Sequence, residues 1–486
     1  MTAGRLVMVN VRGKALDGDQ RAFLQRHDLR AVVLFRENLG TEAEVRNLVA
    51  DLRATLGERA LIAIDQEGGA VVRATFLPQP PAAMALGATR DEALAHAVGA
   101  AVARGLRSLG FNWNFAPVLD VNNNPANPVI AERSFGADPR AVAKLAGAWM
   151  RGSLDEGVAC CVKHFPGHGD THVDSHLDLP VVDKTQAGLD ALELVPFRAL
   201  RDRAPAIMTA HIVYPRIDPD HPATLSRRIL GDMLRKTWRY DGVVITDSLV
   251  MNAIRDRYGH ARASVLALRA GADMVMALGT LDEQAAAIDA IQSAIARGEL
   301  DAASVQRSNA RLDALASRFP AQASPYPDAM RAADDALMRR AWARALTVVR
   351  GAAPPPREAP LRVVTQRDVP GDGVAEAGPS SAAVARLFDD FADVELVRVH
   401  DLAGFDLARL PSDGRSTVLA SNMRARYGVQ PAAPDLHLVL WNPFQALDLA
   451  VPTVVTYGYA DGALDALRAW LEGRATAPGH PPVPLD

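Results

Sequence analysis

The chain of 486 residues is long for one domain, and its 49% hydrophobic and 23% charged residues are proportions typical of a soluble globular protein. A net charge of −4 and an aromatic content of 5% argue against nucleic acid or an anionic membrane surface as a partner. No apolar run is long enough to span a bilayer, and the start of the chain lacks the apolar stretch of a signal peptide. Because its only two cysteines, Cys160 and Cys161, are adjacent, we expect a reduced protein of the cytoplasm; the oligomeric state stays open.

Short apolar runs alternate with longer amphipathic stretches over the first part of the chain. Eight runs have the character of buried strands, at residues 6–11, 31–35, 60–65, 111–121, 158–163, 206–211, 242–247 and 272–278. Helix-like segments lie between them, for example at residues 41–56, 92–109, 139–156 and 261–270. This alternation predicts a (β/α)8 barrel of the TIM type over residues 1–317. An open doubly wound sheet is disfavoured, because no Gly-x-Gly-x-x-Gly turn follows the first strand.

A proline-rich break follows the predicted barrel. Residues 318–327 read Arg-Phe-Pro-Ala-Gln-Ala-Ser-Pro-Tyr-Pro, which indicates a linker, assigned to residues 318–336. Beyond it, six candidate strands lie at residues 346–350, 361–366, 394–400, 417–421, 436–441 and 453–457, before a closing helix at 461–471. Residues 337–486 are therefore predicted to form a smaller C-terminal α/β sandwich domain.

Titratable residues gather at the ends of the predicted barrel strands. The third strand ends at Asp65, the fourth leads to Asp120, the fifth ends at Lys163, the sixth at His211 and the seventh at Asp247. The carboxyl ends of barrel strands form the catalytic face of this fold, so these side chains predict one polar pocket with several carboxylates. Such a pocket, without a cofactor motif, suits hydrolysis or transfer at a glycosidic bond.

The stretch after the fifth strand is rich in histidine. Histidines at positions 164, 168, 172 and 176 have the spacing of ligands on one helix face. Pro166, Gly167 and Gly169 break such a helix, so we expect a loop and no metal site. The roles of His168 and His172 stay open.

These residues also carry a family resemblance. The run Lys163-His-Phe-Pro-Gly-His-Gly-Asp-Thr-x-x-Asp-Ser-His176, with Asp-Gln-Glu-Gly-Gly from Asp65 and Arg-Ser-Phe-Gly from Arg133, closely resembles glycoside hydrolase family 3. More narrowly, it resembles the β-N-acetylhexosaminidase branch. The family's usual Ser-Asp-Asp-Leu-x-Met reads Thr-Asp-Ser-Leu-Val-Met here, from position 246 to position 251. A weaker resemblance to the family's second domain lies at residues 454–459.

The resemblance implies roles for individual residues. Asp247 would be the nucleophile that forms a glycosyl-enzyme intermediate, His176 the general acid/base, and Asp174 the partner of His176. The residues expected to bind the N-acetylglucosamine ring are Asp65, Arg73, Arg133, Lys163 and His164. We add His211 to the substrate-binding set because it ends the sixth strand. No cofactor and no metal are expected.

The pair Asp174 and His176 also has a physical rationale. In an extended segment, residues two apart project to the same side, so the carboxylate could fix the imidazole tautomer. Histidine can protonate a leaving oxygen and then activate water, because its pKa lies near neutral pH. A neutral histidine would not repel an anionic acceptor, so phosphorolysis is an open alternative to hydrolysis.

The sequence therefore predicts a retaining exo-acting β-N-acetylhexosaminidase for small carbohydrates such as muropeptide or chitooligosaccharide fragments. A β-N-acetylglucosaminide phosphorylase and a β-glucosidase of the same family are the nearest alternatives. A metal-dependent barrel hydrolase and a non-catalytic sugar-binding protein are alternatives from other classes.

Overall fold

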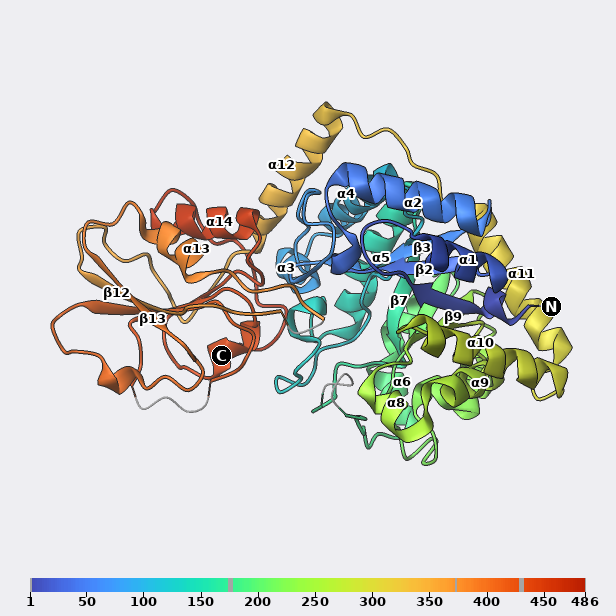
Figure 1. Cartoon of the computed structure of the whole chain (residues 1–486). Helices are drawn as coiled ribbons and strands as arrows, with labels where there is room; N and C mark the ends of the chain where they lie inside the picture. Colours follow the sequence, from blue (N-terminus) through green and yellow to red (C-terminus); the bar gives the residue numbers. More distant parts are fainter. Residues whose placement is uncertain (1, 174–177, 372–373, 428–431, 486) are drawn as a thin grey trace.

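A computed structural model describes residues 2–173, 178–371, 374–427 and 432–485. The chain forms a closed barrel and a separate second domain, joined by the long helix α12 (Asp328–Ala345) (Figure 1). The predicted fold class is confirmed in both parts. Among the described residues, every helix is too short or too polar to cross a membrane.

Each of the eight predicted barrel runs coincides with one barrel strand, although β7 and β9 extend beyond the ends of their runs. The strands are β1 (Val7–Asn10), β2 (Ala31–Leu34), β3 (Leu61–Ile64), β6 (Trp113–Asn114), β7 (Ala159–Phe165), β8 (Ala206–Thr209), β9 (Val243–Ser248) and β10 (Met274–Met276). All neighbours pair in parallel, and β10 closes the ring on β1. Strands such as β2 and β3 are completely buried, because barrel side chains face either the barrel interior or the surrounding helices.

One predicted strand is much shorter than its apolar run. Residues 111–121 were expected to be extended throughout, but only Trp113 and Asn114 form β6. The Asn114 side chain bonds both backbone groups of Gln66, and Pro117, which has no N–H to offer a ladder, follows shortly after. Residues 111–121 are mostly apolar because the segment is buried, and most of it is not a strand.

Helices surround the barrel, and most of the larger ones begin at a residue whose side chain caps the helix N-terminus. The larger ones are α1 (Gly18–Arg26), α2 (Glu42–Leu56), α4 (Glu92–Leu109), α5 (Pro139–Asp155), α9 (His260–Ala270), α10 (Leu281–Ala296) and α11 (Ala302–Arg318). Thr41 and Glu44 form a reciprocal capping box at the start of α2, and Asp138 caps α5 just before Pro139. Shorter helices are α3 (Ala83–Thr89), α6 (Gln186–Ala191), α7 (Leu194–Leu200) and α8 (Asn252–Tyr258).

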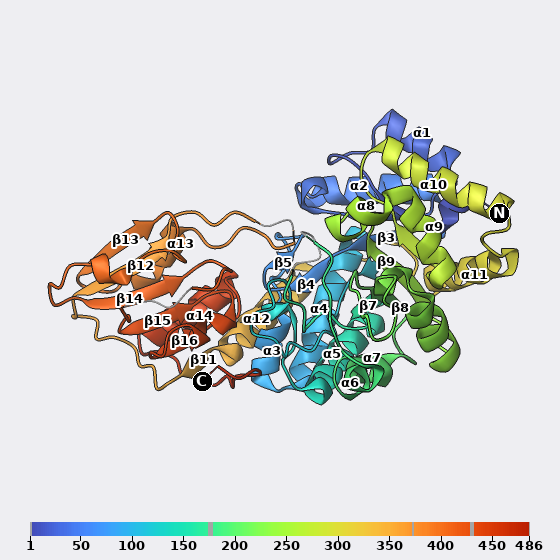
Figure 2. The same cartoon turned by 90° about the horizontal axis from the view of Figure 1, so that it is seen from below.

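The second domain is a six-stranded sheet flanked by helices (Figure 2). Its strands are β11 (Thr347–Val349), β12 (Leu361–Gln366), β13 (Val394–Val399), β14 (Ser416–Ser421), β15 (Leu436–Val439) and β16 (Thr453–Val455). Their order is β11-β16-β15-β14-β12-β13, and only β11 is antiparallel to its neighbour. Helices α13 (Ser381–Ala385) and α14 (Asp461–Leu471) complete the domain, and α14 packs against α12.

An apolar cluster joins the two domains. It combines α3 residues of the barrel, such as Met84, with second-domain residues such as Phe444 and Tyr457. Trp342 of α12 lies in the same cluster. Between the domains, residues 319–327 connect α11 to α12, which begins inside the stretch assigned to the linker. The exact domain boundaries therefore stay a prediction.

Candidate active site

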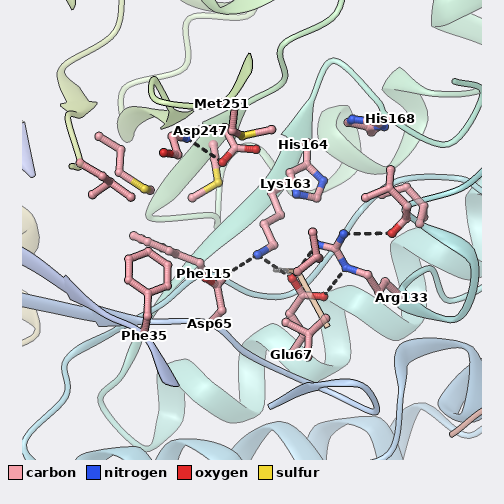
Figure 3. A pocket seen from close by; sticks show the side chains of 18 of the residues that line it. Phe35, Asp65, Glu67, Phe115, Arg133, Lys163, His164, His168, Asp247 and Met251 are labelled. Atoms are coloured by element: carbon pink, nitrogen blue, oxygen red, sulfur yellow. Dashed lines mark hydrogen bonds and ion pairs between the residues drawn. The ribbon is translucent and has the colours of Figure 1, made fainter. Parts of the chain in front are cut away.

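A cavity of about 340 Å³ lies at the carboxyl ends of the barrel strands. Figure 3 shows Lys163 and His164 of β7, Asp247 of β9 and Asp65 beside β3 pointing into it. Its volume is at the lower end of the range for small-molecule sites, which suits one sugar residue better than a long polymer.

A buried network of charges forms one side of this cavity. The Lys163 ammonium nitrogen lies 2.6 Å from a carboxylate oxygen of Asp65 and 2.6 Å from one of Glu67. Arg133 holds Glu67 in a bidentate pair, with its Nε and Nη2 at 2.9 and 2.8 Å from the two carboxylate oxygens. The side chains of Lys163, Arg133 and Glu67 are only 3%, 6% and 7% exposed. Charges this deep are stable only when they are paired.

The pKa values in the network follow from this pairing. Burial alone would raise the pKa of Glu67, but the positive charges of Arg133 and Lys163 outweigh it and hold that pKa well below its usual range. Burial would lower the pKa of Lys163, but the carboxylates of Asp65 and Glu67 outweigh it and raise that pKa. Glu67 and Lys163 are therefore both ionised at neutral pH.

Asp120 organises the two histidines beside this network. It is fully buried; its Oδ2 lies 2.6 Å from His164 Nδ1, and its Oδ1 accepts the backbone N–H groups of His164 and His168. Burial would raise the pKa of Asp120, but the neighbouring His164 outweighs it and lowers that pKa. Because an ionised carboxylate can only accept, His164 donates from Nδ1, which leaves Nε2 for a ligand. Burial, with the charge of His164, lowers the pKa of His168 to about 4.

Asp247 lies on the opposite wall, near the end of β9. Its Oδ1 accepts the backbone N–H of Ser248 at 2.7 Å. Apolar side chains lie around it in the cavity, including Met208, Met251 and Met276. A carboxylate in such a setting can reach the anomeric carbon of a sugar held by the charged side of the cavity.

Arg73 brings the second domain to the cavity. Its Nη1 lies 2.9 Å from Oε1 of Glu376, and its Nη2 donates to the backbone oxygen of Val374 at 2.8 Å. Val374 lines the cavity itself and packs against Val71 and Val129. Whether the second domain reaches the site could not be predicted from the sequence, and the structure shows that it does.

Six of the predicted site residues line this one cavity. They are Asp65, Arg73, Arg133, Lys163, His164 and Asp247. His211 is not among the lining residues; it is 1% exposed, and its ring nitrogens lie near Thr224 Oγ1 and the backbone oxygen of Ser248. It supports the end of β9 next to Asp247. Asp174 and His176 lie outside the described residues.

Sequence reasoning missed several residues of the site. Glu67 sits inside the quoted Asp-Gln-Glu-Gly-Gly run, and its spacing of two from Asp65 could have indicated it. The sequence gives His168 no role, and the structure shows that it lines the cavity. His172 lies outside that lining; its Nδ1 is 3.2 Å from Asn124 Nδ2. No sequence signal points to Val374, because it comes from another domain.

In the ranges that the structure describes, no group of three or more His, Cys, Asp or Glu side chains has the arrangement of a metal site. Cys160 and Cys161 are both free and buried.

Comparison with known proteins agrees with this geometry. Residues 2–315 match the family model described as the glycosyl hydrolase family 3 N terminal domain. A β-hexosaminidase from Alkalilimnicola ehrlichii is 38% identical over 278 residues, which cover 56% of this chain and 79% of that protein. A β-hexosaminidase A from Pseudoalteromonas piscicida is 38% identical over 279 residues, 52% of this chain, and the match spans only 46% of that longer protein.

Among solved structures, a family 3 β-N-acetylglucosaminidase from Paenibacillus sp. FPU-7 superimposes with a TM-score of 0.90 at 34% identity. The alignment covers 99% of this chain and 98% of that one, so both domains have the same arrangement in the two proteins.

Proposed function

Because the chain belongs to glycosyl hydrolase family 3, we propose that it is a retaining, exo-acting β-N-acetylhexosaminidase. It removes terminal β-linked N-acetylglucosamine, in the cytoplasm, from muropeptide or chitooligosaccharide fragments. The observation that carries the proposal is that Asp247 lines the same small cavity as the buried network of Lys163, Glu67 and Arg133. The names of the relatives support the sugar, and the two free cysteines support a reducing compartment.

The charged side of the cavity would hold the sugar hydroxyls. Lys163 uses two of its three N–H donors on Asp65 and Glu67, which leaves one for a hydroxyl. His164 offers Nε2, since its Nδ1 is committed to Asp120. Groups held this firmly need little reorganisation when the sugar binds, which favours a well-defined position of the ring.

The reaction would proceed in two displacements. The Asp247 carboxylate attacks the anomeric carbon while the bond to the leaving oxygen breaks and an acid protonates that oxygen. Water, deprotonated by the same acid/base residue, then attacks the anomeric carbon, and the ester bond to Asp247 breaks. We assign the acid/base role to His176 and its orientation to Asp174, on the family resemblance of their motif, which their spacing of two residues supports.

Replacing Asp247 by Ala tests the proposal. With an aryl β-N-acetylglucosaminide as substrate, we expect kcat to fall by about a thousandfold or more, because the covalent step loses its nucleophile. Turnover close to that of the wild type would remove Asp247 from this role. The unfolding temperature of the variant is measured alongside, to exclude simple loss of fold.

The same assay separates the alternatives. An aryl β-glucoside as the better substrate would favour a β-glucosidase. Formation of N-acetylglucosamine 1-phosphate in the presence of phosphate would favour a phosphorylase. Loss of activity after exhaustive chelation would favour a metal-dependent hydrolase.

A further inference from the structure

Val374 and Glu376 of the second domain lie at the cavity and against its wall residue Arg73. Val374 lines the cavity wall, and Glu376 lies two residues further along the chain. We propose that Glu376 is a positioning residue that holds Arg73 at the sugar-binding wall, so that the affinity of the barrel for its sugar depends on the second domain. This inference rests on the proposed function.

Glu376 is held at both its backbone and its side chain. Its backbone N–H donates to the oxygen of Ala70 at 2.8 Å, and its carbonyl accepts from the hydroxyl of Tyr459 at 3.1 Å. One carboxylate oxygen lies 2.9 Å from Arg73 Nη1 and the other 3.6 Å from Arg36 Nε. The carboxylate therefore lies between two arginines of the barrel.

Arg73 is divided between the two domains. Its backbone N–H donates to the Gln66 side chain of the barrel at 3.0 Å, while the guanidinium binds Glu376 and the backbone oxygen of Val374. An arginine side chain has many rotamers, and fixing one of them before substrate arrives lowers the entropic cost of binding. The second domain supplies that fixation.

Glu376 also balances charge at the cavity rim. Arg36 directly follows Phe35, which lines the cavity, and Arg73 comes from the hairpin of β4 (Gln66–Gly68) and β5 (Val71–Val72). Without the carboxylate, two positive side chains from different loops would repel each other at short range. Arg73 would then leave its position in the cavity wall for part of the time.

The test uses the full chain with Glu376→Gln, which keeps the shape and removes the charge. We expect KM for an aryl β-N-acetylglucosaminide to rise about tenfold and kcat to stay within about twofold, because a positioning contact is lost and the reacting groups are not. Arg344→Gln is the matched control. It removes an ion pair between α12 and Asp91 of the barrel, with atoms 2.7 Å apart, and no residue of that pair lines the cavity, so KM should not change.

A second background shows whether Glu376 acts through Arg73. In an Arg73→Met chain, Glu376→Gln should have no further effect on KM, because the guanidinium that it positions is gone. An unchanged KM in the single variant, or an equal rise in both backgrounds, would overturn the inference while leaving the proposed function intact. A wild-type chain that hydrolyses no N-acetylhexosaminide would overturn both.

Discussion

At the scale of single residues, Glu67 has the most constrained environment in the cavity. It sits between Lys163 and Arg133, and its side chain is 7% exposed. A carboxylate in this position is tolerated because both of its oxygens are paired with cations. Its removal would leave the buried positive charges of Lys163 and Arg133, with the carboxylates of Asp65 and Asp120 near them, but without the carboxylate that pairs with both.

We predict that Glu67→Gln lowers the free energy of unfolding by about 3 to 5 kcal/mol at pH 7, as when one partner of a buried ion pair is removed. The native pKa of Glu67 is depressed, so its stabilising contribution is present above the unfolded pKa of about 4.5 and is lost as pH falls towards the native value. The difference between wild type and variant should therefore be constant from pH 7 to about pH 5 and shrink below that.

Denaturant unfolding at a series of pH values measures this difference. Glu58→Gln is the surface control: the Glu58 side chain is 88% exposed and pairs with Arg53 on the surface, so its loss should hardly change stability. A difference for Glu67→Gln that grows on acidification would contradict the assignment.

At the scale of elements, the loop after β7 is shaped by a close backbone approach. A Cβ on Gly169 would lie 1.8 Å from the backbone oxygen of Val121, so only glycine fits there. The neighbouring His168 donates its backbone N–H to Asp120, which also holds His164. Packing of this loop against the segment after β6 therefore places His168 beside Asp120 and the strand residue His164.

We predict that Gly169→Ala destabilises the protein by about 1 to 3 kcal/mol and lowers kcat/KM by about tenfold or more, because the loop must move away from Val121. Gly188→Ala, in helix α6, is the matched control, because its added methyl would have no neighbour closer than 3.6 Å. Steady-state kinetics and thermal unfolding compare the two; equal behaviour would mean that the close approach has no functional consequence.

At the scale of the whole molecule, the two domains are joined next to the site. The indole N–H of Trp441 donates to the carboxylate of the buried Glu132 at 2.9 Å, and Glu132 precedes Arg133. Burial raises the pKa of Glu132, despite the opposing charge of Arg424. Trp441 also packs edge-on against Tyr459, which binds the backbone of Glu376. The domain interface and the cavity wall thus share residues.

We predict that Trp441→Ala raises KM by at least about fivefold in protein that is still folded, because both Arg133 and Glu376 lose a support. Trp470→Ala removes an equally large buried side chain from the interior of the second domain. Each of the two variants should lower the free energy of unfolding by about 3 to 5 kcal/mol, but Trp470→Ala should not change KM. Kinetics at a temperature well below both unfolding midpoints separate the two effects. A KM that rises equally in both variants would show that loss of stability alone is responsible.

How much of the fold and of the site could be predicted from the sequence depends on how far apart in the chain the interacting residues lie. Strands could be predicted because burial on two faces produces continuous apolar runs, and helices because amphipathic stretches lie between those runs. The prediction of a long strand at 111–121 was wrong, because burial alone produces a continuous apolar run even where most of the segment is not a strand. In the site, residues close to strand ends, such as Asp65 and Lys163, were found because a parallel barrel brings all strand ends to one face.

By itself, the sequence determined the fold class, the family and several of the side chains that line the cavity, such as Asp65 and Lys163, because each depends on local pattern or on a rule of topology. The tertiary structure alone decided that Glu67 is shared by Lys163 and Arg133, that Asp120 orients His164, and that Glu376 of the second domain holds Arg73. These pairings join residues that are tens to hundreds of positions apart, and no pattern within a segment records which buried charge will find which partner.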